Sequence, residues 1–156
     1  MNKVKINLKV NEENISTEVF ANTLLVDFLR YELKLTGTHV GCDTSQCGSC
    51  IVMLNNKCIK SCSVLIAQCN NSIVTTVEGL GKKDKLHKVQ EAFKNNHGLQ
   101  CGFCTPGILF SALELSSDDK IKSDKQIREF LDGNLCRCTG YHNIVKSIKN
   151  FLNEKN

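Results

Sequence analysis

The cysteines of this chain restrict its possible structures more than any other feature, because there are 10 in 156 residues and their spacings are short. They form one group in each half of the sequence: Cys42, Cys47, Cys50, Cys58, Cys62 and Cys69, then Cys101, Cys104, Cys136 and Cys138. This density is typical of secreted disulfide scaffolds or of chains that bind metal. The remaining sequence must decide between these two classes.

The N-terminal residues argue against a secreted scaffold. Residues 1–23 alternate apolar and polar side chains and lack the continuous apolar segment of a signal peptide. The sequence has no run of about 18 apolar residues that would span a membrane. The net charge of +4 is scattered along the chain, which is typical of a solvated surface. We therefore expect a cytoplasmic metal-binding chain with neither a membrane span nor a nucleic-acid partner.

The first half begins with strand signals. Residues 3–10 alternate with period two, residues 11–14 carry turn-forming side chains, and a second alternating run covers 15–19. Thr23 is placed to cap a short helix. One face of that helix would carry Leu25, Phe28, Leu29 and Leu33.

Further strand signals follow the first cysteines. Residues 51–54 and 57–60 flank Asn55-Asn56, which predicts a tight hairpin. Residues 72–78 are rich in β-branched side chains and indicate a last strand. Two hairpins and a helix on one small sheet make a compact α+β unit.

The stretch 79–83 is predicted to be a boundary, because strand signals end there and helical periodicity begins. Four short helices are expected. The first covers 84–96, with Leu86, Val89 and Phe93 on one face and Gly98 as its stop. The second begins with Thr105 as cap and Pro106, the third follows the capping box Ser123-x-x-Gln126, and the last carries Ile144, Val145, Ile148 and Leu152 on one face. Four short helices predict a small bundle.

The spacing Cys42-x4-Cys47-x2-Cys50, followed by Cys62, is that of plant-type ferredoxins. Gly41 and Gly48 beside the ligands let backbone N–H groups approach the sulfurs. Two other cysteines, Cys58 and Cys69, are interpreted as small buried or half-buried side chains. A zinc site is the alternative, but zinc usually takes two C-x2-C pairs and this segment has one.

In the second group, the pair Cys101 and Cys104 stands directly before the helix expected at Thr105. The pair Cys136 and Cys138 precedes the last helix. Helix N-termini present unpaired N–H groups and favour negative charge, so both pairs suit an anionic cluster. A C-x-C pair also occurs in zinc knuckles and disulfide exchangers.

Three stretches, 41–51 (GCDTSQCGSCI), 98–108 (GLQCGFCTPGI) and 133–149 (GNLCRCTGYHNIVKSIK), carry a resemblance to a known family. They resemble the small iron–sulfur subunit of the molybdenum hydroxylases, the xanthine oxidase and aldehyde oxidoreductase family. The Asp-Thr-Ser run at 43–45 is similar to the carbon monoxide dehydrogenase branch. The resemblance covers nearly the whole chain.

The resemblance implies a β-grasp ferredoxin-like domain over residues 1–79 and an all-α domain over 80–156. It implies two [2Fe–2S] clusters, one on Cys42, Cys47, Cys50 and Cys62 and the other on Cys101, Cys104, Cys136 and Cys138. Gln100 and Cys138 would lie next to a molybdopterin cofactor. The catalytic centres would belong to partners: a large molybdopterin-binding subunit and a medium FAD-binding subunit, assembled as a dimer of heterotrimers. The chain would pass single electrons from molybdenum to flavin.

Two further residues near the cysteines are expected to have structural roles. His39 precedes the first cysteine loop and is placed for a local hydrogen bond, and Arg137 stands between two ligands. No paired carboxylates lie beside an obvious nucleophile, so no catalytic residue is expected in this chain. A free-standing two-cluster ferredoxin and a zinc-stabilised binding module remain the alternative functions; the 6% aromatic content without tryptophan argues against nucleic-acid binding.

Overall fold

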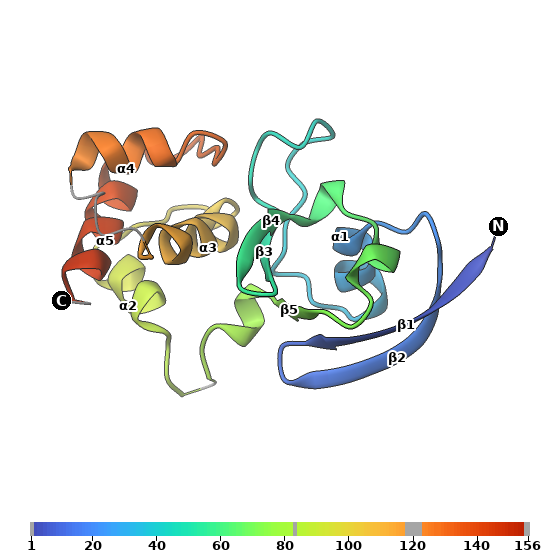
Figure 1. Cartoon of the computed structure of the whole chain (residues 1–156). Coiled ribbons are helices and arrows are strands. Elements are labelled where there is room, and N and C mark those ends of the chain that lie inside the picture. Colours follow the sequence, from blue (N-terminus) through green and yellow to red (C-terminus); the bar gives the residue numbers. More distant parts are fainter. Residues whose placement is uncertain (1, 83, 118–122, 155–156) are drawn as a thin grey trace.

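The structure is a computed structural model that describes residues 2–82, 84–117 and 123–154. A sheet-containing lobe and a helical lobe lie side by side, and the two ends of the chain point away from each other (Figure 1). The expected α+β class is confirmed. Lys83, in the predicted boundary, lies outside the described residues, and the division between residues 79 and 80 stays a prediction.

Five strands form one mixed sheet in the N-terminal lobe. They are β1 (Lys3–Val10), β2 (Glu13–Phe20), β3 (Ile51–Leu54), β4 (Lys57–Lys60) and β5 (Ile73–Thr75), in the order β2-β1-β5-β3-β4. β1 and β5 are parallel, and the other neighbours are antiparallel. Alternate side chains of β1, such as Ile6 and Leu8, are buried because successive residues of a strand face opposite sides.

Both predicted hairpins are present. Asn55 and Asn56 have φ values of 48° and 65°, the left-handed conformation that a two-residue turn between twisted strands requires. The second strand begins at Glu13, earlier than expected. The predicted strand 72–78 is shorter, because the chain turns into η4 (Val77–Gly79) where the Thr76 hydroxyl donates to Glu78 Oε2 at 2.6 Å.

The predicted short helix is α1 (Leu25–Asp27), continued by the wider turn η1 (Phe28–Glu32), and it buries Leu25, Phe28 and Leu29 against the sheet. Thr23 as its cap is wrong. Leu24 occupies the capping position without a side-chain hydrogen bond, and the Thr23 carbonyl instead accepts from the Ile66 N–H at 2.9 Å. Two short 3₁₀ turns complete this lobe: η2 (Ser61–Ser63) and η3 (Ile66–Cys69).

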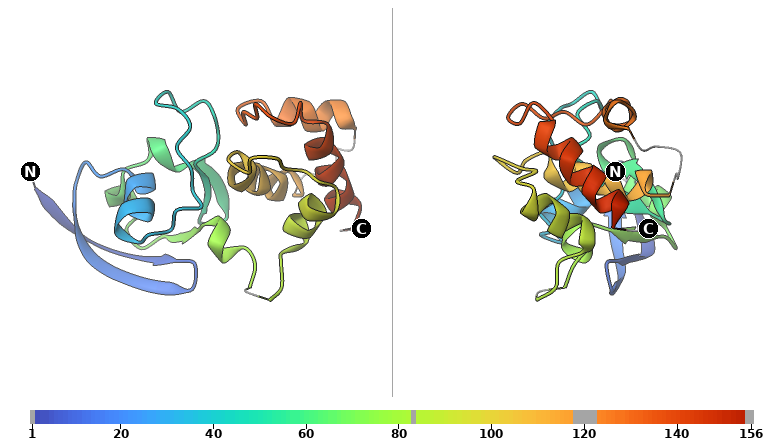
Figure 2. Two further views of the ribbon diagram at one scale, coloured as in Figure 1. Left: turned by 180° about the vertical axis from the view of Figure 1, so that it is seen from behind. Right: turned by 90° about the vertical axis from the view of Figure 1, so that its left-hand side faces the viewer.

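Four helices form the second lobe, as expected: α2 (Lys88–Asn95), α3 (Thr105–Leu115), α4 (Asp124–Phe130) and α5 (His142–Asn153). In both views of Figure 2, α2 and α5 lie side by side at the outer end of the molecule. α3 contacts both α2 and the strands β3 and β4, so it joins the two lobes. Val77 and Leu80 already pack against the helical core.

The helix ends differ from the predictions at three points. α2 starts only at Lys88, because the His87 ring accepts from the Val89 N–H at 3.3 Å, and Leu86 is left outside the helix. Gly98 is not the residue that breaks this helix; His97 takes the left-handed conformation, with φ 52°.

Thr105 as the cap of α3 is also wrong. Cys104 holds the capping position, so Thr105 is already the first helical residue. The Ser123–Gln126 capping box of α4 is confirmed, with the Gln126 N–H donating to Ser123 Oγ at 3.2 Å. Within the described residues, no helix combines the length and the apolar character of a membrane span.

Candidate metal centres

Four cysteines of the first half of the chain gather at one end of the β3–β4 hairpin and are called the first group from here on: Cys42, Cys47, Cys50 and Cys62. Cys42 and Cys47 lie in the segment 33–50, most of which is irregular loop, and Cys50 stands directly before β3. Because β3 and β4 are antiparallel, Cys62 in η2 returns beside Cys50. The Ser61 hydroxyl, 0% exposed, donates to the Cys50 carbonyl at 2.7 Å and fastens this return.

Hydrogen bonds link these four cysteines in two pairs. The Cys47 N–H donates to Cys42 Sγ at 3.4 Å, and the two thiols also interact. The Cys50 thiol interacts with both the thiol and the backbone of Cys62. Ser45 Oγ lies 3.5 Å from Cys62 Sγ and joins the two pairs across the loop.

The backbone around Cys42 favours its thiolate. The Cys47 N–H, with help from the Cys47 thiol and the N–H groups of Thr44 and Gln46, lowers the pKa of Cys42 to about 6. The pKa of Cys50 moves the other way, to about 11, chiefly because burial penalises its charged form. Since the thiolate is the form that binds metal, Cys50 needs a nearby cation to ionise.

The second cysteine group lies where two connecting segments meet. Cys101 and Cys104 immediately precede α3, and Cys136 and Cys138 lie in the segment 131–141 before α5. Cys138 Sγ and Cys101 Sγ are 3.4 Å apart, and the Cys104 thiol interacts with that of Cys136. The sulfurs of the second group therefore also form two pairs.

Polar neighbours orient Cys136. Its Sγ lies 3.1 Å from the Thr139 hydroxyl, and its N–H donates to the Tyr141 hydroxyl at 2.8 Å. Burial opposes ionisation of Cys136 most strongly, but the Thr139 hydroxyl and the N–H groups of Cys138 and Thr139 outweigh it, so its pKa is lowered. The pKa of Cys104 is raised to about 12, mainly by burial.

The pairing of the sulfurs fits a two-iron cluster. Each iron of a [2Fe–2S] cluster shares two bridging sulfides and takes two thiolates, so a cluster needs two separate pairs of sulfurs. Each cysteine group offers two such pairs.

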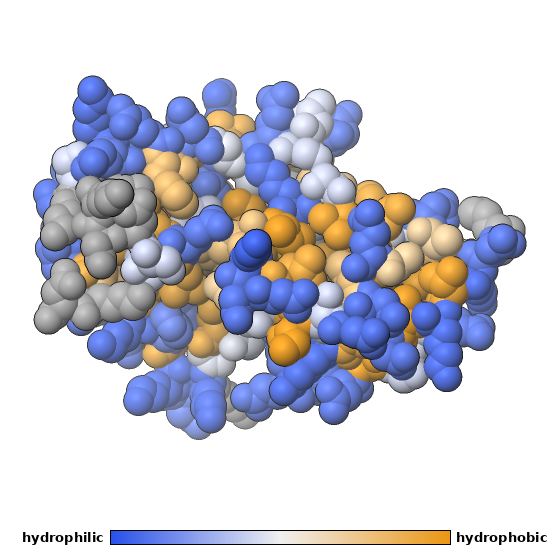
Figure 3. Space-filling model, viewed as in Figure 1, coloured by the Kyte–Doolittle hydropathy of each residue, from blue (hydrophilic) through white to orange (hydrophobic). Residues whose placement is uncertain are grey.

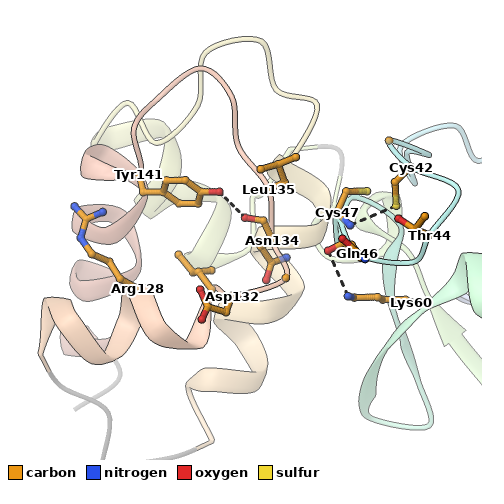
Figure 4. Close-up of a pocket in the computed structure, with 13 residues that line it drawn as sticks. Cys42, Thr44, Gln46, Cys47, Lys60, Arg128, Asp132, Asn134, Leu135 and Tyr141 are labelled. Atoms are coloured by element: carbon orange, nitrogen blue, oxygen red, sulfur yellow. Dashed lines mark hydrogen bonds between the residues drawn. The ribbon is translucent and has the colours of Figure 1, made fainter.

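The two groups are joined by one backbone hydrogen bond. The Leu135 N–H donates to the Cys47 carbonyl at 2.8 Å, and Leu135 directly precedes Cys136. Beside this contact, a cavity of about 770 Å³ separates the Cys42–Cys47 loop from Asn134 and Tyr141 (Figure 4). A cysteine of the first group and the residue beside a cysteine of the second thus share a hydrogen bond.

Glycines allow this close approach. A Cβ on Gly48, whose φ is +73°, would lie 2.3 Å from the Gly133 carbonyl oxygen, and a Cβ on Gly107 would lie 2.0 Å from the Gly48 carbonyl oxygen. The Asn134 Nδ2, buried without a partner, lies 2.8 Å from the same Gly48 Cβ position. Only glycines fit where the loop touches the helical lobe.

The other cysteines lie apart from these groups. Cys58 Sγ donates to the Phe110 carbonyl at 3.2 Å, at the contact between β4 and α3. Cys69 is 0% exposed in the core of the first lobe, with Sγ 3.8 Å from the Leu65 carbonyl. Cys58 is half-buried and Cys69 is buried, in agreement with the expectation for these two residues.

The remaining predicted residues lie around the second group. Gln100 is exposed next to Cys101, and Arg137 is exposed. The hydrogen bond of His39 is not local as expected: Nδ1 lies 2.7 Å from the carbonyl oxygen of Phe103, which is 64 residues away in the chain. The His39 ring also stacks on Phe103 at 4.6 Å between centroids. Sequence reasoning missed Lys60 and Asn134, because their contacts come from loops far apart in the chain.

Large apolar side chains are exposed close to the cysteines. Val40, Leu99, Phe103 and Leu135 are each at least 42% exposed. On the face in Figure 3, hydrophobic atoms reach the surface across the middle of the molecule, and hydrophilic side chains cover most of its edge. Apolar surface of this kind is typical of a chain that binds other proteins.

Comparison with known proteins agrees with this geometry. Residues 8–70 match the family described as "2Fe-2S iron-sulfur cluster binding domain", and residues 76–149 match "[2Fe-2S] binding domain". The chain is 48% identical over 147 residues to the caffeine dehydrogenase subunit gamma of Pseudomonas sp. (strain CBB1), covering 92% of this chain and 88% of that protein. The chain belongs to the small [2Fe–2S] subunits of the molybdenum hydroxylases. As such a subunit, it carries two [2Fe–2S] clusters.

Other members of this family are similar over the same length. The 6-hydroxypseudooxynicotine dehydrogenase complex subunit beta of Paenarthrobacter nicotinovorans is 45% identical, covering 94% of this chain and 92% of that protein. In the crystal structure of quinoline 2-oxidoreductase from Pseudomonas putida 86, one chain superposes with a TM-score of 0.91 at 37% identity, covering 97% of this chain and 94% of that one. None of these three is named a carbon monoxide dehydrogenase, so that branch stays a prediction. The role of an electron-transfer subunit, without a catalytic centre of its own, fits the family.

Proposed function

We propose that Cys42, Cys47, Cys50 and Cys62 hold the first cluster and that Cys101, Cys104, Cys136 and Cys138 hold the second. The observation that carries this proposal is the arrangement of the sulfurs in two tetrads joined by the Leu135–Cys47 hydrogen bond. Within each tetrad, the pairs Cys42/Cys47 and Cys50/Cys62, then Cys101/Cys138 and Cys104/Cys136, would each serve one iron.

Bound [2Fe–2S] clusters supply one-electron redox chemistry, and the chain sets where that chemistry takes place. The Cys47 N–H and the hydroxyls of Ser45 and Thr139 reach the ligand sulfurs and stabilise their negative charge. Tyr141 holds the backbone at Cys136. The hydrogen bond between Leu135, next to Cys136, and Cys47 supports electron transfer through the chain from one tetrad to the other.

The partners that we propose are a large molybdopterin-binding subunit and a medium FAD-binding subunit, in a cytoplasmic dimer of heterotrimers. Cys101 and Cys138 are exposed beside Gln100 and the apolar Leu99, which suits contact with the molybdopterin-binding subunit. The first tetrad would then face the flavin. The relatives named after caffeine and 6-hydroxypseudooxynicotine support an organic substrate for the complex, and a complex of the carbon monoxide dehydrogenase type is the alternative.

The first test is metal analysis of the chain purified without oxygen. We expect about four iron and four acid-labile sulfide per chain, two EPR signals after reduction, and co-purification with larger subunits. Zinc without labile sulfide would overturn the proposal in favour of a binding module. A stable monomer with both signals and no partner would favour the free-standing ferredoxin.

The second test concerns the choice of ligands. Cys62→Ser should abolish or strongly alter the EPR signal of the first cluster, because a serine oxygen replaces one thiolate. Cys58→Ser and Cys69→Ser are the matched controls and should keep both signals, since a hydroxyl can still donate to the Phe110 and Leu65 carbonyls. Two normal signals in Cys62→Ser would refute the assignment.

A further inference from the structure

Lys60 is the last residue of β4, and its side chain crosses to the loop between Cys42 and Cys47. Its Nζ donates to the Ser45 carbonyl at 2.8 Å and lies 3.5 Å from the Gln46 carbonyl (Figure 4 draws Lys60 and Gln46). The side chain is partly buried and lines the cavity between the lobes. Lys60 thus contacts two consecutive peptide units of the loop between Cys42 and Cys47.

The orientation of these two peptide units connects the Lys60 contacts to the backbone N–H groups that face Cys42. A trans peptide is planar, so its C=O and the N–H of the next residue point in opposite directions. With the Ser45 and Gln46 carbonyls turned to the ammonium, the N–H groups of Gln46 and Cys47 are turned away from it. The Cys47 N–H donates to Cys42 Sγ at 3.4 Å, so Lys60 and Cys42 hold the same peptide from its two sides.

The charge of Lys60 is not spent on a carboxylate. The ion pairs that the structure shows among the described residues join Lys125 to Glu129 and Lys149 to Asp124. Asp132 and Arg128 line the same cavity as Lys60, one of each sign, so they add little net charge there. A full positive charge, set against two carbonyl dipoles, therefore lies beside the loop of the first tetrad.

We infer that Lys60 is a positioning residue that raises the reduction potential of the first cluster, by aiming backbone N–H groups at Cys42 and by adding one positive charge. Reduction adds one negative charge to a cluster, and N–H···S bonds and nearby cations stabilise that state. The second tetrad has no such lysine in the contacts described above. This inference rests on the proposed ligand set for the first cluster.

The test uses redox titration of the whole complex, or of the full chain loaded with both clusters, followed by EPR. In Lys60→Met, the equilibrium constant for reducing the first cluster relative to the second should fall about tenfold, equivalent to about 59 mV for one electron. Lys60→Arg keeps the charge and the donors and should restore most of the wild-type value.

Lys57→Met is the matched control, because Lys57 begins the same strand and is exposed, whereas the side-chain hydrogen bonds described for the carbonyls of the loop between Cys42 and Cys47 come from Lys60. Its two potentials should equal those of the wild type. Exchangeable proton couplings of the first cluster, measured by ENDOR, give a second readout: they should weaken in Lys60→Met and persist in Lys57→Met, because the Cys47 N–H loses its alignment.

If Lys60→Met fails to assemble the first cluster, Lys60→Gln serves in its place, since an amide can still donate to the Ser45 carbonyl without the charge. Its potential should also fall. An unchanged first-cluster potential, an equal shift of both clusters, or an equal shift in Lys57→Met would overturn the inference. Absence of two [2Fe–2S] signals in the wild-type protein would instead overturn the proposed function, so the two failures are distinguishable.

Discussion

Gly48 lies at a close contact between the first cysteine loop and the helical lobe. Gly48→Ala would combine a left-handed φ of +73° with a Cβ 2.3 Å from the Gly133 carbonyl oxygen. We expect a loss of about 2–4 kcal/mol in the free energy of unfolding, from backbone strain and overpacking together. The Leu135–Cys47 hydrogen bond should lengthen as well, and chemical denaturation with EPR of the inter-cluster coupling measures both effects.

Gly140→Ala separates the two causes of this loss. Its φ of +61° carries the same kind of strain, but no atom lies within 4 Å of the Cβ position. The expected cost is about 1 kcal/mol, with unchanged inter-cluster coupling. Equal losses in the two variants would mean that the contact between Gly48 and Gly133 contributes nothing.

Among the elements, α4 depends on its cap. The helix is only seven residues long, and a helix this short is marginal without capping or tertiary packing. Ser123→Ala removes the hydroxyl that accepts from the Gln126 N–H and should destabilise the protein by about 1 kcal/mol. Thermal unfolding of the loaded protein measures this loss.

Lys125→Ala is the comparison within the same helix. It breaks an exposed pair with Glu129 at 3.8 Å, a contact worth about 0–0.5 kcal/mol. A loss in Ser123→Ala no larger than that in Lys125→Ala would show that packing of Ile127, not the cap, starts the helix.

At the scale of the whole molecule, removal of iron should affect the cysteine-bearing loops and the regular helices and strands differently. The segments 33–50 and 131–141 carry most of the proposed ligands and little regular structure of their own. Metal binding therefore contributes directly to their order. After chelation of iron, hydrogen exchange should speed up markedly in these segments, while amides of the β1–β2 hairpin and α5 stay protected.

The β1–β2 hairpin is the internal control for this experiment, because its backbone is paired along eight residues per strand. Uniformly faster exchange in every segment would contradict the prediction and mean that the clusters stabilise the whole fold. Unchanged exchange in 33–50 would mean that the loop holds its shape without metal.

Much of the fold could be predicted from the sequence because its signals are local. The Asn55-Asn56 turn, the period of β1 and the Ser123–Gln126 box each depend on a few neighbouring residues. The errors at Thr23 and Thr105 have the opposite origin. Both residues have the chemistry of a cap, but the capping position falls one residue later in the first case, at Leu24, and one residue earlier in the second, at Cys104.

Cysteine spacing, together with the family resemblance, predicted two clusters and distinguished their expected ligands from Cys58 and Cys69, because the ligands of a small cluster come from short loops at set intervals. Tertiary structure decided how the two cysteine groups are joined. The Leu135–Cys47 hydrogen bond, the glycine contacts and the Lys60 contact with Ser45 each join segments at least 14 residues apart. No sequence period encodes such contacts, since they exist only once the loops pack against the sheet and the two lobes pack against each other.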